Sequence, residues 1–418
     1  MDEGLVNALK YLKKYYFKKP LIIVSAPGRV DFLNTHQDYK GLPVIPIAIN
    51  LRTYMMVLGY SNDFKVESIN LREMDEEYID IFNPYSFEIT RERWFGNYFR
   101  AVVSALKKFF KLKELKGIHV VVYSDIPIGS GLASSAALEV AFTKTLDIIY
   151  DLKLKLKDIA EISYIAEHDE YGIPCGRLDQ YSSAFGDIIR LETRPPYNVQ
   201  KISYREFKII VVDSGIRHST GAIHPVRQQE IDSALRKLMT YGGLPHYLYD
   251  KLGYRYDEPK WEDIGEEEIQ PYLSILSENE AKRIIFTIKM NKYTEIAVKI
   301  MLDKAGISEL RQFFNKKLLK EVLRKTDWKN ILLGFIVNKQ HEFLRDLYEV
   351  SLPEIERIRD HILTLKPYGV KISGAGMGGS LLVISKEHSS KMIDVALKAG
   401  ASQAWNVEID DGVKVHST

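Results

Sequence analysis

The sequence predicts an α+β fold in two domains, and three observations support this prediction. Strand-like and helix-like segments mix through the first half without regular βαβ alternation, which favours α+β over a doubly wound sheet. The middle of the chain, from about Ile231 to Leu347, is mostly helical in pattern, and β-like sequence returns after it. A chain of 418 residues, at about 150 residues per domain, predicts two or three domains.

The first elements alternate irregularly between helix and strand. Residues 5–18 place apolar side chains at helical spacing and predict a helix. Residues 21–29 form an apolar run that stops at Pro27-Gly28, so we expect a buried strand ending there. Further strands are expected over residues 44–60 and 118–126. Three predicted strands thus precede the glycine-rich segment that begins at residue 126.

Two helices and a strand are expected next. Apolar residues recur on one helical face after residue 134, and Ser134 or Ser135 stands where it can cap this helix. A second helix is expected over residues 157–171, ending at Gly172. A strand over residues 207–215 follows.

The remaining sequence supplies the domain boundary and the last strands. The Pro195-Pro196 dipeptide is the best boundary marker, so we divide the chain near residue 200, into domains 1–200 and 201–418. Residues 244–270 are rich in Tyr and Glu and are expected to form an irregular insertion. Residues 369–385 return to β structure around a glycine-rich loop.

Composition excludes several function classes. The 58 Lys and Arg nearly balance the 56 Asp and Glu, giving a formal charge of +2, so neither nucleic acid nor a membrane surface is an expected partner. The single cysteine, Cys175, cannot form an intramolecular disulfide and favours a reducing compartment. No HExxH, HxxxH or CxxC spacing supports zinc. Without an apolar run of about 18 residues or a signal segment, we expect a cytoplasmic protein.

The strongest local motif is IPIGSGLASSAA, residues 126–137. A strand ends, a glycine-rich turn lets backbone N–H groups approach a ligand, and a helix begins with its positive dipole end at the turn. This order predicts a phosphate-binding loop, in which Ser134 and Ser135 can touch a phosphate or its Mg²⁺. The loop lacks the lysine of a Walker A motif. The alternative is a glycine-rich turn with serine caps and no ligand.

Two other loops carry weaker signals. SGAGMGG, residues 373–379, has four glycines in seven residues, which either a tight β connection or a ligand requires. SAPGRVDFLNTHQDYKG, residues 25–41, concentrates hydrogen-bonding side chains suited to a polyhydroxylated ligand. A polar surface loop with Asx turns is the alternative for the second segment.

Two acidic residues complete the candidate chemistry. Asp179, in the PCGRLDQ segment at residues 174–180, can accept a hydroxyl proton, and Glu167 can hold Mg²⁺ as a hard oxygen ligand. Each acid alone is more often a solvated charge. Together with a phosphate loop and a polyol loop, they favour phosphoryl transfer.

Taken together, these segments resemble the galactokinase branch of the GHMP small-molecule kinases. APGRVDFLNTHQDY is similar to the first family motif, PGRVNxxGEHTDY, and the phosphate loop and ISGAGMGG resemble the second and third, in family order. Five further stretches point to galactokinases: residues 93–102, 175–186, 216–230, 276–280 and 341–355. The resemblance covers roughly residues 21–385.

The resemblance implies a GHMP kinase fold, with an N-terminal domain like ribosomal protein S5 domain 2 and a ferredoxin-like C-terminal domain. It implies ATP-dependent phosphorylation of a sugar at its anomeric hydroxyl, with galactose as the default substrate and Mg²⁺ as the metal. Asp179 would take the proton and Arg29 would stabilise developing charge. The remaining implied roles are ATP binding by Gly129, Ser130, Gly131, Leu132, Ala133, Ser134, Ser135 and Gly376, metal binding by Ser134, Ser135 and Glu167, and sugar binding by Arg29, His36, Asp38, Gly176 and Asp179.

Departures from the family pattern concern the sugar. Thr35 stands where galactokinases place a Glu that accepts from the C6 hydroxyl, and His224 stands where they place a Tyr against the sugar. Asp31 replaces the family Asn. A neutral Thr35 and a potentially cationic His224 would suit galacturonate, arabinose or another C6-altered sugar better than the usual pocket does.

Two other functions remain alternatives. A non-catalytic regulator that binds sugar and ATP would share the fold, although the intact Ser134-Ser135 pair and Asp179 favour catalysis. Another GHMP kinase, acting on mevalonate or homoserine, would share the phosphate loop, but it does not need the segment that carries His36 and Asp38.

Overall fold

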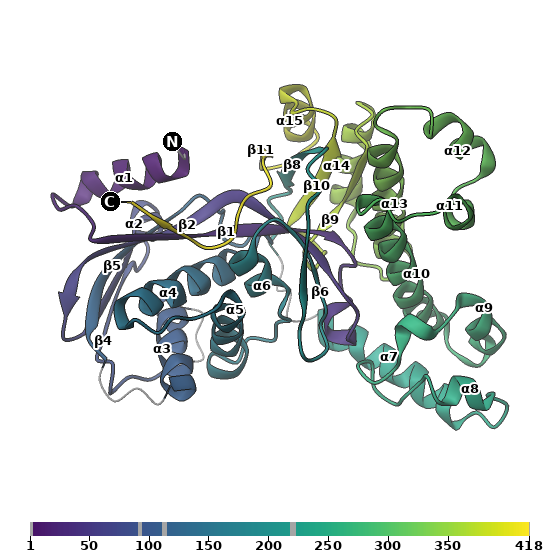
Figure 1. Ribbon diagram of the computed structural model, residues 1–418, viewed down its shortest axis with the longest axis horizontal. Helices are drawn as coiled ribbons and strands as arrows, with labels where there is room; N and C mark the ends of the chain where they lie inside the picture. The colour runs from purple at the N-terminus through teal and green to yellow at the C-terminus, as the bar shows by residue number, and fades with distance from the viewer. Residues whose placement is uncertain (1–2, 91–93, 111–114, 218–222, 418) are drawn as a thin grey trace. The chain divides into compact units, whose positions relative to one another are not determined.

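The computed structural model describes residues 3–90, 94–110, 115–217 and 223–417. Within them the chain forms two compact units that interleave along the sequence (Figure 1). Unit 1 comprises residues 1–29, 47–187 and 409–418, and unit 2 comprises residues 30–46 and 188–408. The sequence predicted two continuous domains, 1–200 and 201–418, whereas each compact unit consists of more than one segment. The predicted domain boundary near residue 200 stays a prediction.

Unit 1 is built on a mixed sheet. Its strands are β1 (Ile22–Leu33), β2 (Ile45–Ser61), β3 (Phe64–Ser68), β4 (Ile79–Phe82), β5 (Gly117–Ser124) and β12 (Lys414–His416). They lie in the order β12-β1-β2-β5-β3-β4, with β3 and β5 parallel and the neighbouring pairs β1–β12, β2–β5 and β3–β4 antiparallel. β1 and β2 also carry the chain across the boundary between the units.

Helices cover both faces of this sheet (Figure 1). They are α1 (Glu3–Tyr15), α2 (Ile69–Glu73), α3 (Gly96–Phe110), α4 (Ser134–Tyr150), α5 (Leu156–Ile165), the π-helical turn η2 (Ala166–Glu170) and α6 (Leu178–Phe185). α1 buries Ala8 and Leu12 against Tyr54 and Met56 on one face, and α3 to α6 lie together on the other face. A strand covered on both sides has an apolar run rather than alternation, which explains the near-complete burial of β1.

Unit 2 combines a four-stranded antiparallel sheet with a large helical part, among the residues described. Its strands are β6 (Ile188–Leu191), β7 (Val199–Ile202), β8 (Lys208–Asp213), β9 (Gly369–Ser373), β10 (Ser380–Ser385) and β11 (Gln403–Val407). The sheet order is β11-β8-β10-β9. β6 and β7 pair antiparallel with each other outside this four-stranded sheet, as strands of the eight-stranded sheet.

The helices of unit 2 pack against this sheet and against one another. They are η1 (Asp38–Lys40), α7 (Ile223–Thr240), α8 (His246–Tyr249), η4 (Trp261–Asp263), α9 (Glu266–Ile269), η5 (Gln270–Ile275), α10 (Glu278–Met301), α11 (Ile307–Phe313), α12 (Lys316–Val322), α13 (Trp328–Asp346), α14 (Pro353–Leu363) and α15 (Ser390–Lys398). The core joins strand residues such as Val212 and Val383 to Phe286, Leu344 and Tyr348 of the helical side. Tyr348 is therefore fixed by the core of the unit.

Most expected elements are present, with two corrections. The strand expected to stop at Pro27-Gly28 continues to Leu33, because both its faces are buried. The expected serine cap of α4 is wrong: Ala133 is the N-cap, in a left-handed conformation with φ 60°, and Ser134 and Ser135 are the first helical residues. Their hydroxyls are therefore not used as the N-terminal cap.

The expected insertion at residues 244–270 contains short helical turns joined by loops. It packs on α10 through Trp261, which is 1% exposed and lies in one apolar cluster with Ile284 and Ile288. An irregular segment thus contributes to the core of unit 2. Residue 93 and residues 218–222, which belong to two of the family-like stretches, lie outside the described residues.

Candidate functional site

The central contact of unit 1 is a two-point bond between Arg29 and Asp179. Arg29, near the middle of β1, donates from Nε to Oδ1 of Asp179 at 2.8 Å and from Nη2 to Oδ2 at 2.9 Å. Asp179 lies in the first turn of α6, and its side chain is 29% exposed. Such a fork fixes both the position and the orientation of a carboxylate. The predicted catalytic pair is thus assembled within one unit.

The glycine-rich loop of residues 125–133 is bound to the same strand. Arg29 donates from Nη1 to the carbonyl of Gly131 and from its backbone N–H to the carbonyl of Leu132. A Cβ at Gly28 would lie 2.7 Å from the Leu132 oxygen, so only glycine allows this approach. Strand β1 therefore holds Asp179 and the loop together.

The loop itself has the backbone that its glycines predict. Gly129 and Gly131 have φ of 71° and 76°, and both are exposed, whereas Ser130 is buried and its hydroxyl donates to the carbonyl of Pro127. Ser134 and Ser135, half-buried, open the 17-residue helix α4. The start of a helix attracts anions through its unpaired N–H groups and its dipole.

Glu167 lies in the π-helical turn η2 and is 6% exposed. Burial raises the pKa of Glu167 to about 7, and the charge of Asp179 adds to the rise. Hydrogen bonds from Ser135, Cys175 and Gln180 lower the pKa of Glu167, but they offset only part of the rise. A buried carboxylate beside a second carboxylate is a setting that a cation stabilises.

The Gln180 side chain is a contact that the sequence prediction missed. It follows Asp179 on α6, is fully buried, and donates from Nε2 to Oε2 of Glu167 at 2.6 Å. Its place directly after the predicted base was the available signal. Gly176 precedes the same helix in an irregular segment.

In unit 2 the polar loop after β1 binds the sheet. Lys371 of β9 donates from Nζ to the backbone oxygen of Asp31 at 2.7 Å and to Oγ1 of Thr35 at 2.9 Å. His36, with φ 65°, donates from Nε2 to the carbonyl of Ala375 at 3.0 Å. Thr35, His36 and the third glycine-rich loop are therefore neighbours, and Asp38 opens η1 just beyond them.

His224 joins this group from the start of α7. Its ring centre is 5.1 Å from that of His36 and 5.5 Å from that of Tyr39. Burial lowers the pKa of His224 below its usual value, and the charge of Lys40 lowers it further. This lowering disfavours the cationic form of His224, which the sequence predicted only as a potential cation. For His36, burial again dominates, with His224 and Lys40 contributing, and the pKa falls well below its usual value.

Lys40 is a secondary cause of both shifts, and the sequence predicted no role for it. Its ammonium group is fully buried, bonded to Oγ1 of Thr287 at 3.0 Å and placed over the rings of Phe286 and Tyr348 at 4.8 and 4.9 Å. Cation–π contacts of this kind compensate in part for lost hydration. Burial also lowers the pKa of Lys40 well below its usual value. The pKa values of His36 and His224 therefore fall mainly through their own burial, with Lys40 as a smaller cause.

The third loop is shaped by close packing. Gly376 has φ 85°, and a Cβ there would lie 2.5 Å from the carbonyl oxygen of Val350. Met377 donates its N–H to that same carbonyl at 2.7 Å. These contacts alone explain the glycine at position 376, so its proposed part in ATP binding needs separate support.

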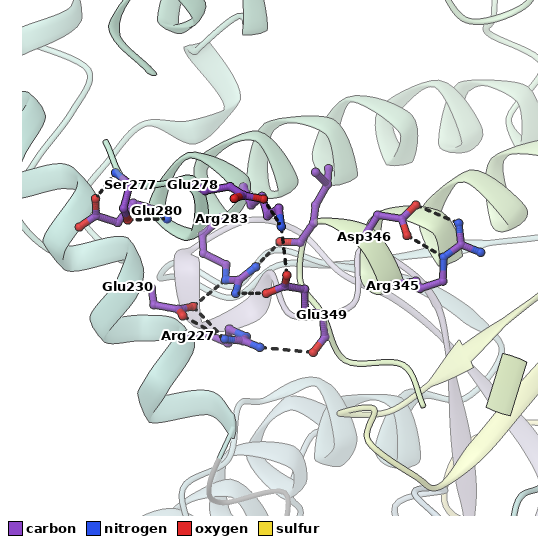
Figure 2. A network of polar contacts seen from close by, with 11 residues as sticks. Arg227, Glu230, Ser277, Glu278, Glu280, Arg283, Arg345, Asp346 and Glu349 are labelled. Carbon is purple, nitrogen blue, oxygen red and sulfur yellow. Dashed lines mark hydrogen bonds and ion pairs between the residues drawn. The ribbon is translucent and has the colours of Figure 1, made fainter. Parts of the chain in front are cut away.

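The segment before Val350 is held at Leu347 and Glu349 by an ion network, of which Figure 2 labels Arg283, Glu230 and Glu349. The guanidinium of Arg283, fully buried, donates to Glu230 at 2.6 Å, to Glu349 at 2.7 Å and to the carbonyl of Leu347. Arg227 also donates to Glu230, at 3.0 Å. The network joins α7 and α10 to the segment that supports the third loop.

No helix among the described residues is long and apolar enough to cross a membrane. No group of three or more His, Cys, Asp or Glu side chains in the described ranges has the arrangement of a metal site.

Comparison with family models gives three matches. The model of the GHMP kinases N-terminal domain matches residues 97–187, that of the GHMP kinases C-terminal domain matches residues 319–403, and that of the galactokinase galactose-binding signature matches residues 10–58. The last match contains the strand and loop that carry Arg29, Thr35 and His36.

Relatives with known names and solved structures agree with these matches. The chain is 30% identical over 386 residues to a galactokinase of Thermosipho africanus, covering 90% of this chain and 92% of the relative. It is 28% identical over 396 residues to a galactokinase of Thermotoga neapolitana, covering 92% and 95%.

Among solved structures, Lactococcus lactis galactokinase complexed with galactose matches with a TM-score of 0.76 and 21% identity, over 98% of this chain and 99% of that one. Methanococcus jannaschii mevalonate kinase matches with a TM-score of 0.60 and 17% identity, over 93% and 98%. At these identities the structures show a shared fold. The fold, the three matched regions and the full-length relatives lead to one conclusion: this chain belongs to the galactokinase family of the GHMP kinases.

Proposed function

We propose that the chain transfers the γ-phosphoryl group of ATP to the anomeric hydroxyl of a monosaccharide, with galactose as the first substrate to test. The observation that carries the proposal is the fork from Arg29 to Asp179 beside the glycine-rich loop. The relatives named galactokinase support the choice of sugar.

The reaction is a displacement at phosphorus. The anomeric oxygen forms a bond to the γ-phosphorus, the bond from that phosphorus to the β–γ bridging oxygen breaks, and ADP leaves with the electron pair. Asp179 accepts the hydroxyl proton, and Arg29 stabilises negative charge that develops on the reacting oxygens. Such transfers depend mainly on positioning and charge stabilisation.

The phosphate-binding role falls to residues 129–135. The N–H groups of the loop and of the first turn of α4 would bind phosphate oxygens, and Leu132 and Ala133 would contribute backbone rather than side-chain groups. Gly376 would contact the nucleotide through its backbone. These assignments stay proposals for Gly129, Ser130, Gly131, Leu132, Ala133, Ser134, Ser135 and Gly376.

The residues of unit 1 fit a bound Mg²⁺. Glu167 is a buried carboxylate with a raised pKa, and Ser134 and Ser135 offer hydroxyl oxygens at the start of α4. Mg²⁺ prefers oxygen ligands, and it commonly uses only one or two protein groups together with phosphate oxygens and water. When bound, it would neutralise charge on the transferring phosphoryl group.

Sugar recognition would use Thr35, His36, Asp38, Gly176 and His224 in addition to the reacting pair. One contact favours a second class of substrate: Thr35 accepts from Lys371 rather than presenting a carboxylate. A sugar that carries a C6 carboxylate, or that lacks the C6 hydroxyl, would therefore meet no negative side chain at position 35. Galacturonate and arabinose are the test compounds for this class.

The test is ADP release measured with ATP, Mg²⁺ and a panel of galactose, galacturonate, arabinose, fucose and N-acetylgalactosamine. We expect turnover with galactose. A clear preference for galactose over the others would exclude the C6-altered class. No turnover with any sugar, together with retained sugar and ATP binding, would instead indicate a regulator.

Asp179→Asn tests the proposed base. It should abolish turnover while ATP still binds. The matched control is Asp346→Asn, which breaks a similar fork from Arg345, with bonds of 2.7 and 2.9 Å, at an exposed position (Figure 2). Near-normal turnover by Asp179→Asn would remove Asp179 from this role.

A further inference from the structure

Two neighbouring residues of α6 contact two side chains with different proposed roles, Arg29 and Glu167. Asp179 is held by Arg29, and Gln180 donates to Glu167 at 2.6 Å. Successive residues of a helix point about 100° apart, so one helical turn can serve both contacts. The position of the proposed base and that of the proposed metal ligand are thereby linked through a rigid element.

The surroundings of Gln180 show that its amide matters for more than packing. Gln180 is fully buried, and its Oε1 accepts no hydrogen bond from a described residue. Glu139 of α4 is also fully buried, and hydrogen bonding with Gln180 lowers its pKa against the larger effect of burial. An apolar side chain at position 180 would avoid a buried, half-satisfied amide. The amide of Gln180 instead lies where its Nε2 donates to Glu167.

Glu167 depends on neutral partners for its orientation. The groups that favour its charged form are a hydroxyl, a thiol and the Gln180 amide, on Ser135, Cys175 and Gln180. Of these, the Gln180 bond at 2.6 Å is the short, directed contact, made to Oε2. A donor on one carboxylate oxygen fixes the plane of the group and leaves the other oxygen's lone pairs for a further ligand.

We propose that Gln180 is a positioning residue that holds the Glu167 carboxylate in its Mg²⁺-binding orientation and couples that orientation to the place of Asp179. This inference rests on the proposed function, because it assumes Mg²⁺ at Glu167. Residues that orient a metal ligand change metal affinity by about 10–100-fold when they are removed.

The test measures Mn²⁺ binding by electron paramagnetic resonance, with the β,γ-imido analogue of ATP present and no turnover. Gln180→Met keeps the side-chain length and removes the amide. We expect it to weaken Mn²⁺ binding about tenfold or more, while sugar affinity and metal-free nucleotide affinity change less than about twofold. Unchanged Mn²⁺ binding in a folded Gln180→Met protein would overturn the inference.

The matched control is Asn330→Leu, which removes a buried amide from unit 2. Asn330 donates to the carbonyl of Glu206 at 2.9 Å and accepts from Tyr204 at 2.7 Å. Its loss should lower the melting temperature without changing Mn²⁺ affinity. If both variants weaken Mn²⁺ binding equally, the effect of Gln180 is general destabilisation and the inference fails. If Gln180→Met does not fold, Gln180→Asn, whose amide is one methylene too short to reach Glu167, takes its place with the same expectation.

Glu167→Gln tests the assumption beneath the inference. It should weaken Mn²⁺ binding more than Gln180→Met does, and an unaffected Mn²⁺ affinity would overturn the inference. Since none of these measurements uses sugar turnover, failure of the sugar panel and failure of this inference are separate results.

Discussion

Three carboxyl groups of unit 1 differ in their surroundings and therefore in their chemistry. Asp179 is bonded through both oxygens to Arg29. Burial and the nearby Asp179 raise the pKa of Glu167 to about 7. Burial raises the pKa of Glu139 well above its usual value, with Glu167 as the next cause. Groups whose environments separate their ionisation are suited to different roles. Burial therefore favours the neutral form of Glu139 beside the proposed base Asp179 and the proposed metal ligand Glu167.

Glu139→Gln should make stability less dependent on pH. The unfolded chain loses the Glu139 proton near its ordinary pKa of 4.5, whereas the folded protein retains it, so the wild-type free energy of unfolding falls as pH rises above that value. The fall is about 1.4 kcal/mol per pH unit until the folded pKa is reached. Urea unfolding at pH 5 and pH 8 should show that the free energy of unfolding of the variant rises relative to that of the wild type as pH increases. Parallel pH profiles would contradict a buried, protonated Glu139.

Arg29→Lys should lower kcat about 100-fold with galactose, the size of effect expected for a lost charge-stabilising donor. Lysine keeps the charge but cannot form the planar fork to Asp179 or retain the bond to Gly131 at the same time. Steady-state kinetics and the melting temperature are the measurements. A change in kcat below about threefold would show that the fork is structural.

At the scale of elements, loops depend on the segments they pack against. The third loop has its shape because Val350 lies against Gly376, and the segment carrying Val350 is bound by the Arg283 network. The glycine-rich loop of residues 125–133 depends in the same way on the approach of Gly28 to Leu132. Glycine is required at both places by backbone contact, in addition to any contact with a ligand.

Gly376→Ala should destabilise the protein by about 3 kcal/mol, from roughly 1–2 kcal/mol for left-handed backbone and roughly 1–3 kcal/mol for overlap with Val350. The matched control is Gly172→Ala: Gly172 has φ 76°, and a Cβ there would meet no atom within 4 Å. It should lose only about 1 kcal/mol. Chemical denaturation gives both values, and equal losses would contradict the packing explanation.

The sequence predicted those elements whose own residues are enough to form them. The apolar runs behind β1, β2 and β5 and the glycine signal of residues 129–131 are local, so these elements were expected. Short strands such as β4 and β6 were missed, because a few residues of β sequence become a strand only when a partner pairs with them. The left-handed Ala133, which replaced the expected serine cap, follows from tertiary packing.

In the candidate site too, some features follow from local sequence and others only from the folded chain. Arg29, Asp179 and Glu167 were recognisable from residue type and motif. The bond from Lys371 to Thr35 joins positions 336 apart, and the lowered pKa of His224 arises mainly from burial, with Lys40 second. Neither can be read from local sequence, because desolvation and long-range contacts exist only in the folded chain.

At the scale of the whole molecule, chain order and compact units do not coincide. Residues 409–418 return to unit 1 after more than two hundred residues of unit 2, and β12 pairs with β1 there. The return is fastened by Arg52, which is fully buried and donates to Asp410 at 2.8 Å and to the carbonyl of Gly412 at 2.7 Å. Arg52 also donates to Ser25 of β1, so a single side chain joins both neighbouring strands to the C-terminal segment.

Arg52→Met should therefore destabilise unit 1 strongly, by about 3–5 kcal/mol. It leaves Asp410 and the carbonyls of Asp411 and Gly412 without the buried arginine that they bind. The control is Lys208→Met, which breaks an exposed pair with Glu408 in unit 2, where the side chains are 42% and 50% exposed. Exposed pairs contribute about 0–1 kcal/mol, so this variant should stay near wild type. Urea denaturation measures the loss, and limited proteolysis followed by mass spectrometry should show faster cleavage within residues 409–418 of Arg52→Met alone. If both variants share one midpoint and one cleavage rate, Arg52 does not hold the C-terminal segment in place.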